Sequence, residues 1–249
     1  MTSQPTVLLV GGTGRTGGRV LAQLLERGVA VRAIVRSATR LPQGVASDPL
    51  LTVVEADLLS LSGEELQRHL EGCDTVISCL GHTISVRGIL GPPYSLVTRA
   101  VTNLARAIAA MRPAKPVRLI LMSTVSVNQP ANADTRRGSG ERLFLGLLCV
   151  LMPPARDNQR AADFLVGQIG EDSPAVEWVA VRPDTLLDGE VTEYRLHDEL
   201  VSSIFKPDGT NMANVAHFMC ELTTDDVAWQ RWKAKMPVIV NAGAQGGEG

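Results

Sequence analysis

The stretch TVLLVGGTGRTG, residues 6–17, decides the fold of this chain. Residues 7–10 are continuously apolar, as expected of a strand that is buried on both faces of a parallel sheet. Three glycines follow in the spacing GxxGxxG, and residues 17–27 then place apolar side chains on one face of a helix. A glycine turn between a buried strand and an amphipathic helix is typical of dinucleotide-binding folds, so we predict such a site here.

Each glycine has a separate expected role in that turn. Gly11 permits the tight turn, Gly14 leaves room for a pyrophosphate, and Gly17 lets the helix pack closely on the strand. The helix N-terminus presents unpaired N–H groups and a partial positive charge to the phosphates, and Thr13 and Thr16 add hydroxyl donors. The alternative is a glycine turn that is needed only for packing.

The residue after the second strand distinguishes NAD from NADP. An NAD site usually has Asp or Glu there, which accepts a hydrogen bond from the ribose 2′-OH. In this chain Arg36 stands at that position. A guanidinium fits a phosphate bidentately, and Arg15 and Arg40 are placed to converge with it. We therefore predict NADP(H) as the cofactor; a solvated arginine at a strand end is the alternative.

Strand-like and helix-like segments alternate along the rest of the chain. Strands are predicted at residues 29–35, 51–54, 75–79, 117–122, 176–181 and 237–240. Helices are predicted at residues 95–111, 156–169 and 215–222, with a short helix opened by the capping box Ser62–Glu65. The alternation predicts an α/β fold, a Rossmann-type doubly wound parallel sheet with a small C-terminal substrate region. We expect residues 1–241 to form a single domain and residues 242–249 a disordered tail.

Two polar stretches, residues 128–140 and 184–212, interrupt this alternation, and both follow strands. Because ligands of such sheets bind at the carboxyl ends of the strands, the two stretches are candidate substrate walls. Tolerated surface loops explain them equally well.

The composition disfavours several classes of protein. The 249 residues are 45% hydrophobic and 20% charged with a net charge of −2, which fits an ordinary globular protein and makes nucleic acid a poor partner. The cysteines form no CxxC pair and the histidines no HxxxH pair, so no metal site is predicted. The N-terminus has the pattern of a strand and not of a signal peptide, so we expect a cytoplasmic location.

The longest apolar run, residues 143–154, is too short to span a bilayer. Its part 143–152 fits a dimer face, a membrane-surface helix or plain core, and we favour the core. A monomer and a homodimer both remain open.

Six segments together resemble one family. They are VLLVGGTGRTGGRV from Val7, AIVRS from Ala33, EADL from Glu55, VISCLG from Val76, LILMST from Leu119 and VAVRP from Val179. They resemble the atypical short-chain dehydrogenase/reductases, in the NmrA-like, NAD(P)H-binding branch. The resemblance implies contacts of Asp57 and Leu58 with the adenine, of Cys79, Leu80 and Gly81 with the ribose toward the nicotinamide, and of Ser123 with the nicotinamide ribose. For Asp57, capping of the turn at residues 58–62 is the alternative.

The chain departs from the family in its catalytic pair. The wider superfamily uses Tyr-x-x-x-Lys, in which the lysine lowers the pKa of the tyrosine. Here Tyr94 and Tyr194 are followed four residues later by Thr98 and Asp198. Gln159 stands where relatives often have a lysine, and a neutral side chain cannot depress the pKa of a neighbour by charge.

Other side chains are therefore candidates for proton donation and polarisation. Ser123, His82 and Asn158 are the candidate catalytic residues. A surface position for His82, and cofactor binding or strand-end capping for Ser123, are the alternatives. Asp184 follows the sixth strand, where it either touches the substrate or forms a turn.

Three functions compete. The first is an NADPH-dependent reductase of a small carbonyl, quinone or conjugated substrate that takes its proton from water, since the cofactor itself supplies the hydride. The second is a redox sensor or regulator that binds NADP(H) without turnover and acts on a protein partner; the missing catalytic pair favours it. The third, an isomerase or epimerase of nucleotide sugars, is disfavoured because such enzymes usually keep the tyrosine and the lysine.

Overall fold

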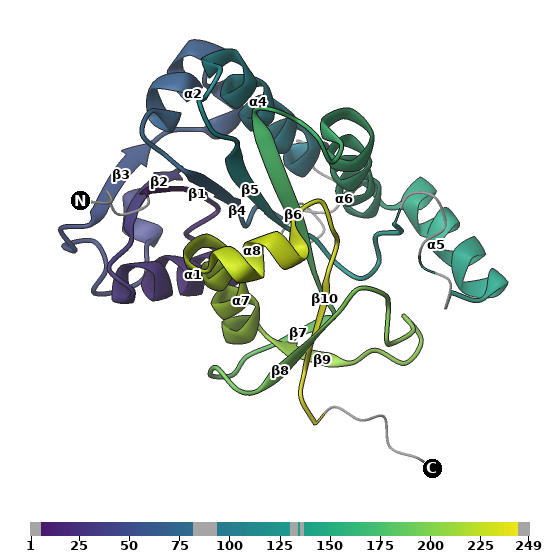
Figure 1. Ribbon diagram of the computed structural model, residues 1–249. Helices are drawn as coiled ribbons and strands as arrows, with labels where there is room; N and C mark the ends of the chain where they lie inside the picture. Colours follow the sequence, from purple (N-terminus) through teal and green to yellow (C-terminus); the bar gives the residue numbers. More distant parts are fainter. Residues whose placement is uncertain (1–5, 82–93, 130–133, 135–136, 244–249) are drawn as a thin grey trace.

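A computed structural model describes residues 6–81, 94–129, 134 and 137–243. Its centre is an eight-stranded sheet in the order β3-β2-β1-β4-β5-β6-β10-β8 (Figure 1). The strands of this sheet are β1 (Thr6–Val10), β2 (Ala30–Val35), β3 (Leu51–Glu55), β4 (Thr75–Ser78), β5 (Val117–Met122), β6 (Val176–Pro183), β8 (Tyr194–His197) and β10 (Val238–Asn241). All neighbouring strands are parallel except β8, which runs antiparallel to β10. The predicted Rossmann-type fold is confirmed.

Helices cover both faces of the sheet (Figure 1). They are α1 (Arg15–Glu26), α2 (Gly63–Leu70), α4 (Leu96–Met111), α5 (Ser139–Leu151), α6 (Pro153–Phe164), α7 (Met212–Thr224) and α8 (Asp226–Trp232). Alternate residues of β1 face the two layers: Val7 and Leu9 pack with α1 and α7, while Leu8 and Val10 pack with α2, α4 and α6. The continuous apolar run of β1 thus has the burial on both faces that the sequence predicts.

The sequence predicts the end of a helix or strand accurately where a side chain caps it. Ser62 Oγ accepts a hydrogen bond from the Glu65 amide at 3.2 Å, and the Glu65 carboxylate accepts from the Ser62 amide at 2.8 Å. The predicted capping box at the start of α2 is therefore confirmed. These hydrogen bonds, first of all that with the Ser62 backbone, lower the pKa of Glu65.

The stretch 184–212 differs from its prediction as a loop. It contains β7 (Thr185–Leu187) and β9 (Gly209–Asn211), which pair with each other, and β8, which extends the main sheet. These strands are only three or four residues long, too short for a recognisable alternation of apolar and polar residues. The short helix α8, capped by Asp225, was also not predicted.

The apolar run 143–152 was predicted as core, and this prediction is wrong. It forms most of α5, of which Leu145 is buried while Leu143, Leu147 and Val150 are exposed. The helix stands beyond α6 at the margin of the molecule (Figure 1). Since α6 packs on α4, which lies over the sheet, α5 finds no sheet face to cover.

No helix among the described residues has the length and apolar character needed to cross a membrane. At the C-terminus, Ala242 and Gly243 form a turn after β10. The predicted disordered tail lies mostly outside the described residues, from residue 244 onward.

Candidate functional site

The glycine turn brings three segments into close contact at the carboxyl end of β1. Gly11 has a positive φ of 83°, and its carbonyl accepts a hydrogen bond from the Gly14 amide at 3.0 Å. A Cβ at Gly11 would lie 2.6 Å from the carbonyl group of Cys79, and a Cβ at Gly17 would lie 2.2 Å from the Gly11 oxygen. Any larger residue at these two positions would push the turn away from β4 or α1.

The N-terminus of α1 is left without a side-chain cap. Gly14 occupies the N-cap position in an extended conformation, and the first turn contains no acidic residue. A Cβ at Gly14 would meet only the Gly11 oxygen, at 3.3 Å, so the outer side of Gly14 is open. Thr13 is half-buried and Thr16 is buried. The first amides of α1 therefore remain available to an anion.

The three arginines predicted to hold a 2′-phosphate lie in different settings. Arg15 is 66% exposed and forms an ion pair of 2.5 Å with Asp188, which Arg19 also contacts at 3.2 Å. Arg36, directly after β2, and Arg40 are both exposed, and within the described part of the chain neither side chain has a hydrogen-bond or ion-pair partner. Arg36 and Arg40 are thus free to bind a ligand, whereas Arg15 would have to leave the Asp188 carboxylate to bind the same ligand.

The loop that carries Arg36 is held by a residue that the sequence did not single out. Glu55 ends β3 beside Val35, and its carboxylate accepts a hydrogen bond from the Ala38 amide. Glu55 belongs to the EADL motif, but its role in holding this loop follows from the pairing of β2 with β3, which the motif alone does not indicate.

Asp57 takes the capping role that the sequence left open. Its carboxylate accepts a hydrogen bond from the Leu59 amide at 3.1 Å and caps the 3₁₀ turn Leu58–Ser60. Leu58 is buried in the core beside Leu66. Contacts of Asp57 and Leu58 with an adenine remain a prediction.

The end of β4 forms the other side of the glycine turn. The Cys79 amide donates to the Val10 carbonyl at 2.9 Å, and burial raises the pKa of the Cys79 thiol. Leu80 is half-buried and Gly81 is exposed. The candidate catalytic residue His82 lies outside the described residues.

Ser123 is the most informative of the candidate catalytic residues. It follows β5, and its amide donates to the Val181 carbonyl of β6 at 2.7 Å. Its hydroxyl is buried and has no hydrogen-bond partner among the described residues, and the same holds for Ser78 at the end of β4. Buried hydroxyls are nearly always bonded, so Ser123 Oγ fits a site that receives a polar ligand group.

The start of α6 holds its neighbours through Asp157 and Gln159. The buried Asp157 carboxylate accepts hydrogen bonds from the Val97 amide at 2.7 Å and the Thr98 amide at 3.0 Å, and so caps α4. Gln159 donates to the Asn128 carbonyl at 3.0 Å and accepts from the Asn128 amide at 2.8 Å. The residue at the expected lysine position therefore fixes the segment after β5 to α6.

Asn158, between them, is half-buried, and its side chain has no hydrogen-bond partner in the described part of the chain. It remains a candidate donor.

The two tyrosines do not replace the missing pair. Tyr194 donates a hydrogen bond of 2.5 Å to Glu221 and lies 3.0 Å from His217 Nδ1, both on α7. Burial and the hydrogen bond to the Glu221 carboxylate raise the pKa of Tyr194 far above its usual value. Tyr94 is exposed just before α4.

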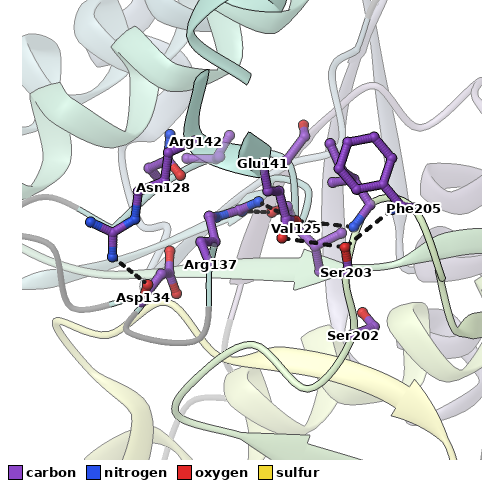
Figure 2. A network of polar contacts seen from close by, with 12 residues as sticks. Val125, Asn128, Asp134, Arg137, Glu141, Arg142, Ser202, Ser203 and Phe205 are labelled. Atoms are coloured by element: carbon purple, nitrogen blue, oxygen red, sulfur yellow. Dashed lines mark hydrogen bonds and ion pairs between the residues drawn. The ribbon is translucent and has the colours of Figure 1, made fainter. Parts of the chain in front are cut away.

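A buried ionic network joins the two stretches predicted as substrate walls (Figure 2). Arg182, at the end of β6, is fully buried and pairs with Asp134 at 3.0 Å. Arg137 pairs with Glu141 at 3.1 Å, and Glu141 also accepts from the Ile204 amide at 3.0 Å. The pKa of Arg182 is lowered because burial penalises its charge.

Asp184 has a structural role as well. Its carboxylate accepts from the Thr185 amide at 2.7 Å, the Asp208 amide at 3.1 Å and the Ser202 hydroxyl. Of the two roles left open for Asp184, the structure therefore shows the turn.

A groove of about 960 Å³ lies at the opposite edge of the sheet, where Val29, Thr75 and Val117 mark the amino ends of the strands. Ligands of open parallel sheets bind at the carboxyl ends. We therefore place the candidate site at the glycine turn and not in this groove. Within the described residues, no three potential metal ligands lie close together.

This parallel sheet, with a glycine turn and an uncapped helix N-terminus after β1, defines a dinucleotide-binding protein of the Rossmann type. Residues 11–226 match the model of the NAD(P)H-binding family, and the chain belongs to that family.

Two relatives are similar to this chain in sequence. An uncharacterized chloroplastic protein of Arabidopsis thaliana is 24% identical over 82% of this chain and 73% of its own length. A 4-hydroxy-2-methyl-3-oxo-4-farnesyl-3,4-dihydroquinoline-1-oxide ketoreductase of Stigmatella aurantiaca is 28% identical over 48% of this chain, but the match spans only 33% of that protein.

Two solved structures share the fold at low sequence identity. An oxidoreductase from Lactococcus lactis has a TM-score of 0.69 at 21% identity, covering 95% of this chain and 91% of its own. A short-chain dehydrogenase/reductase from Veillonella parvula, solved in complex with NADP, has a TM-score of 0.65 at 15% identity, covering 96% of each chain.

Proposed function

We propose that this chain is an NADPH-dependent reductase of a small carbonyl, quinone or conjugated substrate, from the NmrA-like branch of the atypical short-chain dehydrogenase/reductases. The observation that carries the proposal is the buried hydroxyl of Ser123 at the carboxyl end of β5, which has no hydrogen-bond partner in the described part of the chain. It lies at the same edge of the sheet as the glycine turn after β1, where such folds bind their ligands.

The turn fits the phosphates of a dinucleotide. Gly11 and Gly17 hold the turn against α1 and β4, and Gly14 leaves the N-terminus of α1 open. The side chains of Arg36 and Arg40 are exposed and have no partner among the described residues, which favours NADP(H) over NAD(H) because a guanidinium binds a 2′-phosphate. The NADP bound to the Veillonella parvula protein is in keeping with this choice.

When bound, the nicotinamide supplies hydride chemistry. The chain itself provides orientation: Ser123 Oγ donates a hydrogen bond to the ribose or to the substrate oxygen, and Asn158 offers a second donor. Without a Tyr–Lys pair, water delivers the proton. The Stigmatella aurantiaca relative is named for reducing a ketone on a ring that carries a farnesyl chain, which supports an apolar cyclic ketone as one substrate to test.

The cofactor proposal is tested by isothermal titration with NADPH and NADH. Arg36→Ala should weaken NADPH binding by about one to two powers of ten, because a charge-assisted hydrogen bond contributes roughly 1.5–3 kcal/mol. NADH binding should change little. The matched control is Arg106→Ala, because Arg106 is an exposed arginine on α4. Equal NADPH affinity of the Arg36 variant and the wild type would refute the assignment.

Turnover is tested by following NADPH oxidation at 340 nm with quinones, flavins, aldehydes, enones and cyclic ketones. We expect oxidation with at least one class, and Ser123→Ala should lower kcat more than it raises the Kd for NADPH. An unchanged kcat in this variant would remove Ser123 from the reaction.

The alternative is a redox sensor that binds NADP(H) and acts on a partner protein. Gln159 favours it, since its amide is fixed to Asn128 at the position where relatives often have lysine. Tight NADPH binding without oxidation of any substrate class would support the sensor and exclude the reductase.

The remaining expectations belong to this proposal as well. We take residues 1–241 as one domain with substrate walls at residues 128–140 and 184–212, which the ionic network ties together. We also keep the expectation of a cytoplasmic location, because free cysteines suit a reducing compartment. The relative from Arabidopsis thaliana is chloroplastic by name, so fractionation of the source cells is the direct test of location.

A further inference from the structure

The outward face of α5 is apolar from Leu143 to Leu151. Leu143 is 77% exposed, Val150 72% and Leu151 65%, and Phe144 and Leu147 lie on the same side. These positions follow the helical spacing i, i+1, i+4, i+7 and i+8, so they form one stripe. We call these five residues together with Phe205 the α5 face; the Phe205 ring lies 5.5 Å from the Phe144 ring and is 67% exposed.

The α5 face is held in place by its opposite side. Glu141, in the first turn of α5, pairs with Arg137 and accepts from the Ile204 amide (Figure 2). Leu145 is buried, and α5 packs on α6. The helix is therefore fixed to the protein by contacts that leave the apolar stripe pointing outward. A helix that is apolar on all sides is expected to be covered, and large exposed apolar patches mark interaction surfaces.

The charges near the α5 face are predominantly basic. Between residues 139 and 163, three of the four exposed charged residues are Arg142, Arg156 and Arg160, and Lys206 adjoins Phe205 in sequence. The fourth, Asp163, accepts a hydrogen bond from Gln159 at 2.9 Å. The other two acids, Glu141 and Asp157, are buried and bonded.

This charge pattern distinguishes between two possible occupants. A second copy packed about a two-fold axis would bring the basic rim of one chain against the basic rim of the other. An anionic lipid bilayer instead accepts the apolar stripe among its acyl chains and attracts the basic rim. The 13 residues of α5 extend about 20 Å, so the helix would lie in the plane of the interface.

We propose that the α5 face docks this protein onto the surface of an anionic lipid bilayer. The proposal does not depend on turnover. The segment at residues 200–206 is part of the predicted substrate wall 184–212 and is hydrogen-bonded to Glu141 of α5. If the reductase function also holds, docking would turn this segment toward substrates dissolved in the membrane.

The test is flotation of the full chain with vesicles of phosphatidylcholine, with and without phosphatidylglycerol. We expect binding to the anionic vesicles that weakens at high salt. Val150→Glu should lower this binding more than tenfold, because it removes an apolar side chain that would enter the bilayer and adds a charge that the anionic membrane repels. Arg142→Glu should lower it on anionic vesicles only.

Val227→Glu is the matched control, since Val227 is 79% exposed on α8. It should bind vesicles as the wild type does, and all variants should retain the thermal unfolding midpoint of the wild type. Absence of wild-type binding to anionic vesicles, or equal loss in the Val150 and Val227 variants, would overturn the proposal. So would a dimer in light scattering that Val150→Glu dissociates and Val227→Glu does not, because a second copy would then cover the face.

Discussion

Asp157 is expected to be one of the most sensitive positions of the fold. Its buried carboxylate accepts hydrogen bonds of 2.7 and 3.0 Å from the amides of Val97 and Thr98, the second and third residues of α4. Asp157→Ala removes both acceptors and leaves two amides near the N-terminus of α4 unsatisfied. Hydrogen bonds to a charged group contribute roughly 1.5–3 kcal/mol each, so the free energy of unfolding should fall by about 3–6 kcal/mol. That is a large part of the 5–15 kcal/mol typical of a domain.

Urea unfolding followed by far-ultraviolet circular dichroism measures this loss. The thermal midpoint should fall by about 6–24 °C, since 1 kcal/mol corresponds to roughly 2–4 °C in a chain of this size. Asp157→Asn keeps one acceptor oxygen, so it should lose about half as much.

Asp172→Ala is the control, because Asp172 is exposed in the turn before β6. Its stability should stay within about 0.5 kcal/mol of the wild type. A loss below 1 kcal/mol in Asp157→Ala would show that water satisfies the two amides and that this carboxylate does not hold α4.

Three further predictions concern charge. Asp134→Asn leaves the guanidinium of its fully buried arginine partner without a counter-ion and should destabilise the chain by about 3–5 kcal/mol in urea unfolding, whereas a loss below 1 kcal/mol would indicate that water or another group compensates. Burial raises the pKa of Cys73 to about 11 and of Cys220 to about 12, so both thiols stay neutral in the folded chain while they ionise in the unfolded one above about pH 8.5. The stability that these thiols contribute is complete below that pH and should decrease by up to about 1.4 kcal/mol per pH unit and thiol between pH 9 and 10, and Cys→Ser variants should flatten this slope. Asp188→Ala frees Arg15 from an exposed ion pair that is worth about 0–1 kcal/mol, so titration calorimetry should show NADPH binding up to about fivefold tighter, and weaker binding would mean that Asp188 itself supports the cofactor.

The parts of the fold that were predictable are those with a strong local signal. The strand predicted at residues 117–122 became β5 with the same ends, and the capping box at Ser62 opened α2 as expected. In both cases the residues that form the element also determine its limits. The strands β7, β8 and β9 carry no such signal, because their pairing with distant partners determines them.

The apolar run in α5 shows a limit of composition. Its residues have the apolar character of a core helix, and burial depends on whether another element lies above them. In this chain α6 takes the place beside α4, so α5 lies outside it. No periodicity within residues 143–152 contains that information.

The candidate site divides in the same way. The glycine turn was predictable because its constraints act over a few residues, as the 2.2 Å approach at Gly17 shows. The partner of Gln159 was not predictable, since Asn128 lies 31 residues away. The sequence therefore identified a glutamine where the resemblance implies a lysine, but not the hydrogen bonds of Gln159 to the Asn128 backbone.

Arg15 connects the glycine turn with the stretch at residues 184–212. It belongs to the glycine turn, yet its partner Asp188 lies 173 residues later in the stretch predicted as a substrate wall. Both side chains are about two-thirds exposed, so the pair adds little stability and a phosphate, which offers more acceptors, can replace the carboxylate. Binding of a dinucleotide would then release Asp188 from Arg15 and alter the wall. Such a link would serve a reductase that closes on its substrate and a sensor that reports its cofactor equally well, so the choice between them depends on the measurement of turnover.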